Sequence, residues 1–157
     1  MADELTHLDA EGRARMVDVG AKAVTVREAV AEAHVTMSPA VLRRVLAADL
    51  PKGDAFAVAR IAAIQGAKRT ADLVPLCHPL PLDSVNAELE PTVSGVLIRV
   101  TARVTGRTGV EMEAMTGASI GAVALYDMVK GLDRGVEIGP VRLIAKSGGK
   151  SGEWRRG

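Results

Sequence analysis

Aromatic residues are nearly absent from this chain, which has one Trp, one Tyr and one Phe among 157 residues. Hydrophobic residues still make up 48% of the sequence, so its core must be built from aliphatic side chains. Cysteine is equally scarce, since Cys77 is the only one. A single cysteine excludes an intramolecular disulfide and is typical of a protein from a reducing cytoplasm.

Long apolar runs and a charge excess are missing as well. No run approaches the roughly 20 residues that span a bilayer, and the N-terminus lacks the basic start and apolar stretch of a signal peptide. The 20 basic and 19 acidic residues nearly cancel, which argues against general nucleic-acid binding. We therefore expect neither a membrane nor a nucleic acid as partner.

The length fits one domain with a sizeable core. We interpret residues 1–157 as a single cytoplasmic domain, in which residues 1–25 form an N-terminal arm and residues 147–157 a Gly/Lys-rich tail.

The stretch from Gly109 to Gly131 organises the rest of the chain, because it predicts one long helix made mostly of small residues. Glu111 and Glu113 lie at its start, where acidic groups suit the helix dipole. Gly117 and Gly121 are four residues apart and share one face, so another backbone can approach closely there.

The remaining elements follow from periodicity and caps. Residues 26–37 alternate apolar and polar and predict a strand, although their alanine and glutamate content would favour a helix. Ser38-Pro39 and Asp54 are good helix starts. The predicted elements after the first strand are helices over 39–49 and 54–70, paired strands over 84–89 and 96–104, and a last strand over 136–146, where Pro140 requires an edge or a bulge.

This order, with the 109–131 helix before the last strand, predicts an α+β fold of the ferredoxin-like βαββαβ type. Its four-stranded antiparallel sheet would carry helices on one face. The 54–70 helix is apolar on most of its circumference, which indicates burial on more than one side. In so small a domain this favours a subunit interface.

A stiff, apolar loop over 72–82 presents Cys77 and His78, because its three prolines fix an extended backbone. A thiol beside an imidazole can be a nucleophile, a metal site or a binding loop, and Cys77 can equally be an ordinary buried residue. No second cysteine or HxxxH motif supplies further zinc ligands, so we expect no metal. His78 fits an acid/base or hydrogen-bonding role better than Cys77 fits a nucleophile.

Two further patterns concern charge. The tail sequence GGKSG lacks the first glycine and the following helix of a P-loop, so it is either a phosphate nest with Lys146 and Lys150 or a flexible end. Lys52, Lys68, Arg69 and Lys130 also lie next to breaks in structure, and their convergence would suit a polyphosphate. Asp127 and Lys130 are three apart on the long helix, as either a proton-transfer pair or a surface ion pair.

Seven stretches together resemble the MoaC family of cyclic pyranopterin monophosphate synthases. They are MVDVG at 16–20, KGD at 52–54, ARIAAIQGAKRT at 59–70, LVPLCHPLPL at 73–82, TGRTGVEMEAMTGAS at 105–119, YDMVK at 126–130 and GPVRLIAKSGGKSG at 139–152. The similarity covers nearly the whole chain, and it is weaker only at 40–50, in the hairpin and after Glu153.

The resemblance implies an enzyme of molybdenum cofactor biosynthesis. It would rearrange a 3′,8-cyclised dihydroguanosine triphosphate into cyclic pyranopterin monophosphate and release diphosphate, without a metal or another cofactor. It also implies a homo-hexamer, a trimer of dimers, with each active site between subunits.

The resemblance also implies residue roles. Asp127 and Lys130 would be catalytic. The implied substrate-binding residues are Leu76, Cys77, His78, Met112, Glu113, Lys52 and Lys146. We predict that Asp127 and His78 meet across a subunit interface and not within one chain.

Two other readings of the chain stay open. A non-catalytic ferredoxin-like regulator that binds a nucleotide or another small ligand would need the basic pocket but not the acid–amine pair. A thiol hydrolase would need Cys77 as its nucleophile.

Overall fold

The computed structural model describes residues 6–157 and contains four helices and five strands within that range. In chain order these are β1 (Thr25–Thr36), α1 (Pro39–Leu46), α2 (Ala55–Lys68), α3 (Thr70–Leu73), β2 (Ser84–Thr92), β3 (Gly95–Gly106), α4 (Glu111–Val129), β4 (Glu137–Ser147) and β5 (Trp154–Arg155). The predicted arm, residues 1–25, is described from residue 6 onward, and its residues 1–5 lie outside the described part.

All strands join one antiparallel sheet in the order β2-β3-β1-β4-β5. The α+β class and the antiparallel sheet are confirmed, but the prediction of four strands is wrong. The fifth strand, Trp154–Arg155, lies in the predicted tail and pairs with Ala145 and Lys146 of β4. Two residues are too short to show an alternating pattern in the sequence.

Strand β1 covers residues 26–36 of the stretch 26–37, for which alternation predicted a strand and composition favoured a helix. It lies between β3 and β4 and pairs with both over most of its length. Its odd-numbered residues from Ala29 to Val35 are buried, as the period of two predicts. The register between β1 and β4 is irregular between Ala33 and Val35, opposite Gly139 and Pro140, so the predicted bulge is confirmed.

The helix starts are confirmed as well. Ser38 Oγ accepts a hydrogen bond from Val41 N at 3.3 Å, and Asp54 Oδ1 accepts one from Ala57 N at 3.0 Å. The first helix ends at Leu46, three residues earlier than predicted. The second ends at Lys68, and the short helix α3 takes up the start of the predicted 72–82 loop.

Small residues let α4 pack closely against α2 and the sheet. A Cβ atom added at Gly117 would lie 3.0 Å from the carbonyl oxygen of Ala63 and 3.1 Å from Val100. One added at Gly121 would lie 3.0 Å from the Ala63 side chain. The predicted close approach at these two glycines is therefore confirmed, and it holds the long helix against a core of aliphatic side chains.

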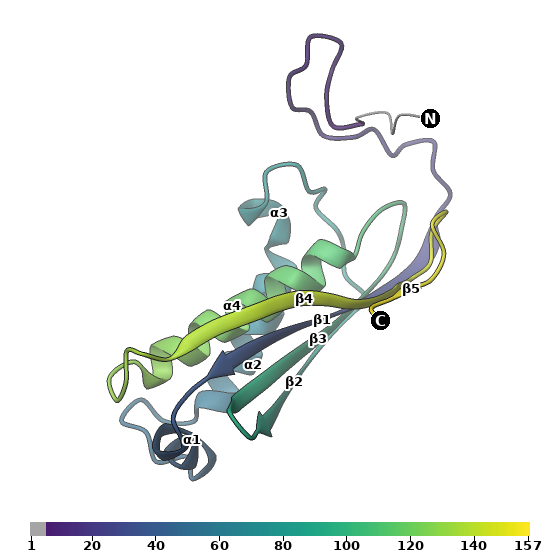
Figure 1. The fold of residues 1–157 in the computed structure, drawn as a ribbon. Helices are drawn as coiled ribbons and strands as arrows, with labels where there is room; N and C mark the ends of the chain where they lie inside the picture. Colours follow the sequence, from purple (N-terminus) through teal and green to yellow (C-terminus); the bar gives the residue numbers. More distant parts are fainter. Residues whose placement is uncertain (1–5) are drawn as a thin grey trace.

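Helix α4 runs along the sheet and reaches from one end of the strands toward the other (Figure 1). Its C-terminal end lies near α1, whereas its N-terminal end lies toward the arm, β5 and the chain's C-terminus. Side chains at its two ends therefore belong to different regions of the molecule. No helix in the described part is long and apolar enough to span a bilayer.

Candidate functional site

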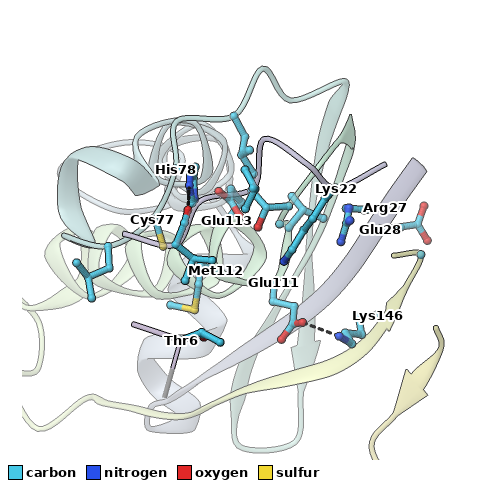
Figure 2. Close-up of a pocket in the computed structure, with 18 of the residues that line it drawn as sticks. Thr6, Lys22, Arg27, Glu28, Cys77, His78, Glu111, Met112, Glu113 and Lys146 are labelled. Carbon is cyan, nitrogen blue, oxygen red and sulfur yellow. Dashed lines mark hydrogen bonds and ion pairs between the residues drawn. The ribbon is translucent and has the colours of Figure 1, made fainter. Parts of the chain in front are cut away.

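A cavity of about 500 Å³ lies at the N-terminal end of α4 (Figure 2). Five segments that are distant in the sequence form its walls. They are the arm, the start of β1, the loop around Cys77, the turn leading into α4, and the end of β4. The antiparallel pairing of β1 with β4 brings Lys146 opposite Ala29 and so beside the start of β1.

Six of the predicted substrate-binding residues line this cavity. They are Leu76, Cys77, His78, Met112, Glu113 and Lys146. The loop and the first turn of α4 come together because Leu80 packs beside Gly109, where a Cβ atom would collide with the leucine side chain. Lys52, Asp127 and Lys130 are not among the residues that line the cavity.

The Cys77 thiol is half-buried in the wall of the cavity. Burial raises its pKa, and the nearby Glu113 carboxylate adds to the effect. A raised pKa keeps the thiol protonated, and a protonated thiol is a poor nucleophile. The geometry therefore favours Cys77 as part of the pocket wall.

The neighbouring His78 ring reaches across to the arm. Its Nε2 lies 2.7 Å from the backbone oxygen of Val17. Since a carbonyl oxygen only accepts, this nitrogen carries the proton in that contact. His78 thus fastens the arm over the cavity in addition to lining it.

Glu113 is the buried acid of the cavity, with only 4% of its surface exposed. This burial raises the pKa of its carboxyl group above the ordinary value. A carboxyl group in such surroundings keeps its proton to a higher pH than an exposed one and can hydrogen-bond to a polar ligand.

Three cationic side chains, Lys22, Arg27 and Lys146, gather on one side of the cavity, opposite Cys77 and His78 in Figure 2. Lys146 Nζ lies 3.0 Å from Glu111 Oε1 and donates a hydrogen bond to Ser151 Oγ at 2.7 Å. Carboxylates of Glu28, Glu111 and Glu113 line the cavity as well, so an anionic ligand would suit only the side where the three cations gather.

Sequence reasoning missed Lys22, Arg27 and Glu111. A signal for Arg27 was available, since it precedes Ala29 by two residues and so shares the covered face of β1. A charged residue on that face must reach a polar region at the end of the strand. Lys22 had no comparable pattern, because its place depends on contacts of the arm.

The predicted catalytic pair lies elsewhere, at the C-terminal end of α4. Lys130 Nζ lies 2.8 Å from Asp127 Oδ1, and Lys52 Nζ lies 2.9 Å from Oδ2 of the same carboxylate. Hydrogen bonds from Lys130 and then Lys52 lower the pKa of Asp127 to about 2. The structure thus joins three of the predicted residues in a half-exposed cluster, the 52/127/130 cluster.

The cluster and the cavity do not meet within one chain. Glu113 and Asp127 lie on the same helix, and at 1.5 Å per residue their separation is about 20 Å. The described residues also include no group of three His, Cys, Asp or Glu side chains that could hold a metal ion. One chain therefore holds a cavity lined by cationic and acidic side chains and, separately, an acid–amine cluster of a kind suited to proton transfer.

Comparison with known proteins finds one family. The model of the MoaC family matches residues 16–149. Proteins called cyclic pyranopterin monophosphate synthase are similar over nearly the full length. The one from Chloroflexus aggregans is 56% identical over 156 residues, which is 98% of this chain and 94% of the relative.

Two further relatives carry the same name. The protein from Roseiflexus sp. strain RS-1 is 56% identical over 153 residues, 96% of this chain and 97% of its own length. The protein from Brucella ovis is 53% identical over 156 residues, 98% of this chain and 94% of its own length.

Proposed function

The chain belongs to the MoaC family, and we propose that it is a cyclic pyranopterin monophosphate synthase of molybdenum cofactor biosynthesis. Its substrate is the 3′,8-cyclised dihydroguanosine triphosphate. The enzyme rearranges the purine and ribose carbons into a pyranopterin, closes a cyclic phosphate and releases diphosphate. Identity above 50% to proteins of that name along nearly the whole chain is the observation that carries this proposal.

The cavity at the start of α4 binds the substrate in this account. Its three cations, Lys22, Arg27 and Lys146, neutralise the triphosphate, and the wall formed by Leu76, Cys77, His78, Met112 and Glu113 holds the cyclised nucleoside. This orientation is supported by the gathering of cations on one side of the cavity and by the buried Glu113 carboxyl on the N-terminal turn of α4.

The 52/127/130 cluster supplies general acid/base catalysis. Lys130 and Lys52 donate protons from their ammonium groups and accept them back as neutral amines, and the Asp127 carboxylate, which stays ionised, holds both groups in place. Several ring atoms must gain or lose protons during the rearrangement, and a fixed pair of amines around one carboxylate suits this task.

The active site is composite, because a second subunit brings its 52/127/130 cluster to the cavity. Asp127 and His78 then meet across the interface. We propose a homo-hexamer, a trimer of dimers, for this assembly. Val58 and Ile61 on α2 and Val123 on α4, with exposed fractions of 42%, 58% and 54%, support it, since apolar helix faces of this kind are commonly covered by another subunit.

The domain organisation, the fold type and the cellular compartment complete the proposal. The chain is one domain, and its fold is a ferredoxin-like sheet extended by β5, which the order β2-β3-β1-β4 of the long strands supports. The protein works in the cytoplasm, as a half-buried, unpaired Cys77 favours.

Diphosphate release tests the function directly. Purified protein is given the cyclised guanosine triphosphate, alongside Lys130→Ala and the control Arg43→Ala, which removes an exposed cation from α1. We expect wild type and Arg43→Ala to release diphosphate at similar rates. In Lys130→Ala the rate should fall at least about a hundredfold. No release by a folded wild-type oligomer would favour a small-ligand regulator, which needs the basic cavity alone.

A further inference from the structure

The segment from Val17 to Lys22 forms part of the cavity wall, although most of it is exposed. Val17 and Val19 are half-buried and line the cavity together with the exposed Lys22. Asp18, Gly20 and Ala21 are exposed to solvent. So little of this segment is buried that its position depends on polar contacts.

Hydrogen bonds fasten the 17–22 segment at both ends. His78 donates to the backbone oxygen of Val17 at 2.7 Å, and Arg107 Nε donates to the backbone oxygen of Lys22 at 3.1 Å. Between these anchors the chain turns, with Lys22 N bonded to Val19 O at 3.0 Å. The backbone of Lys22 is therefore fixed from both sides.

Arg107 also contacts Arg27, a second cation of the cavity, but here the backbone oxygen of Arg107 is the acceptor. Arg27 donates from Nη2 to the backbone oxygen of Arg107 at 3.0 Å and from Nε to that of Gly106 at 3.2 Å. The backbone oxygen of Arg107 thus accepts a hydrogen bond from the Arg27 side chain. The guanidinium of Arg107 donates a hydrogen bond to the backbone oxygen of Lys22. Among the described residues that line the cavity, Thr108 and Gly109 are present and Arg107 is not.

We propose that Arg107 is a positioning residue that fixes Lys22 relative to Arg27, so that the two cations meet the substrate's phosphates at a set spacing. This inference rests on the proposed function only in naming the triphosphate as the ligand. A long lysine side chain loses conformational entropy on binding an anion. If its backbone is already fixed, the entropic cost of binding is smaller. Arg107 acts through Lys22 and makes no contact with the phosphates itself.

Binding of inorganic triphosphate, measured by calorimetry on the full-length oligomer, tests this role without requiring turnover. We expect Arg107→Ala to raise the Kd about tenfold, in line with the loss of a charge-assisted hydrogen bond. Arg43→Ala should leave the Kd unchanged. In turnover, Arg107→Ala should raise KM for the cyclised triphosphate by a similar factor and change kcat less than about twofold.

A double-mutant cycle with Lys22→Ala separates positioning from direct contact. If Arg107 acts through Lys22, then Arg107→Ala adds little to the Kd once Lys22 is alanine. Additive effects of the two substitutions would overturn the proposal, and so would an unchanged Kd in Arg107→Ala. The cycle is repeated with Arg107→Gln, which keeps a polar side chain of intermediate length in case Arg107→Ala does not fold.

The two proposals fail separately in this design. A wild-type protein that binds triphosphate and shows the non-additive cycle but releases no diphosphate would overturn the synthase and leave the role of Arg107 intact. An active wild type with an additive cycle would overturn the role of Arg107 alone.

Discussion

Lys52 Nζ donates hydrogen bonds to both the carboxylate and the backbone oxygen of Asp127, each at 2.9 Å, although the two residues are 75 positions apart in the sequence. The contact joins the loop before α2 to the last turn of α4. It places Lys52 in the acid–amine cluster, away from the cavity that the other six implied substrate-binding residues line. The proposed catalytic groups thus come from two elements that the fold holds together.

The Asp127 carboxyl should stay ionised under mildly acidic conditions. Its pKa is about 2, below the ordinary 3.8, because Lys130 and Lys52 donate to the charged form. The stabilisation from these contacts is therefore complete above pH 3.8 and is lost as the pH falls through about 2. Carboxyl carbon NMR of labelled protein should show Asp127 fully ionised at pH 4. In Lys130→Ala its midpoint should move upward, and a wild-type midpoint above 3.8 would contradict this account.

Glu113→Gln should stabilise the fold at alkaline pH while lowering turnover. Since the folded state holds the Glu113 proton more tightly than the unfolded chain, stability decreases as the pH rises from 4.5 through the raised pKa. A neutral glutamine avoids that cost. The Tm difference between variant and wild type should be larger at pH 8 than at pH 5, and Glu137→Gln, on the exposed start of β4, should show no such difference. A variant that is destabilised equally at both pH values would argue against a buried charge.

Cys77→Ser should retain most of the wild-type turnover. The thiol has a raised pKa and lines the cavity, so serine replaces one uncharged wall group with another. Diphosphate release by Cys77→Ser and Cys77→Ala should fall by less than about tenfold, the cost of a modest packing change. Complete loss in both folded variants would support the thiol hydrolase instead.

Gly148→Ala should destabilise the protein more than Gly53→Ala does. Both glycines have a positive φ, +87° and +93°, so alanine meets a similar backbone penalty of about 1 kcal/mol at each. A Cβ atom at residue 148 would also collide with the backbone oxygen of Val26, whereas that at residue 53 meets open space. Urea unfolding should give a loss of about 2–4 kcal/mol for Gly148→Ala. Equal losses at both positions would show that β1 and the end of β4 are less closely packed.

Much of the fold could be predicted because its signals are local. The alternation in β1 and β3 and the caps at Ser38 and Asp54 each depend on a few neighbouring residues, and each was confirmed. Strand β5 was missed because two residues pair only with Ala145 and Lys146, which is a long-range contact without a period of its own. The end of α1 was misplaced because Ala48 adopts a left-handed conformation, with φ +52°, which alanine rarely takes.

The cavity was predictable in part. Six of its residues were named from stretches that resemble a known family. Lys22 was missed because its backbone oxygen is held by the distant Arg107 side chain, a contact that side-chain patterns do not reveal. Arg27 bonds to the backbone oxygen of Arg107, and only its place on the covered face of β1 gave a signal. The separation of the 52/127/130 cluster from the cavity follows from helix length alone. The sequence thus predicts which side chains form the site better than it predicts which residues each of them contacts.

Mixing two inactive variants tests the composite site most directly. Glu113→Ala damages the cavity and Lys130→Ala damages the cluster, so each homo-oligomer should release little diphosphate. If every site joins the cavity of one subunit to the cluster of another, random co-assembly of equal amounts leaves about one quarter of the sites with both parts intact. We predict that the co-assembled protein regains about a quarter of wild-type diphosphate release. Activity no higher than that of the separate variants would contradict the shared site.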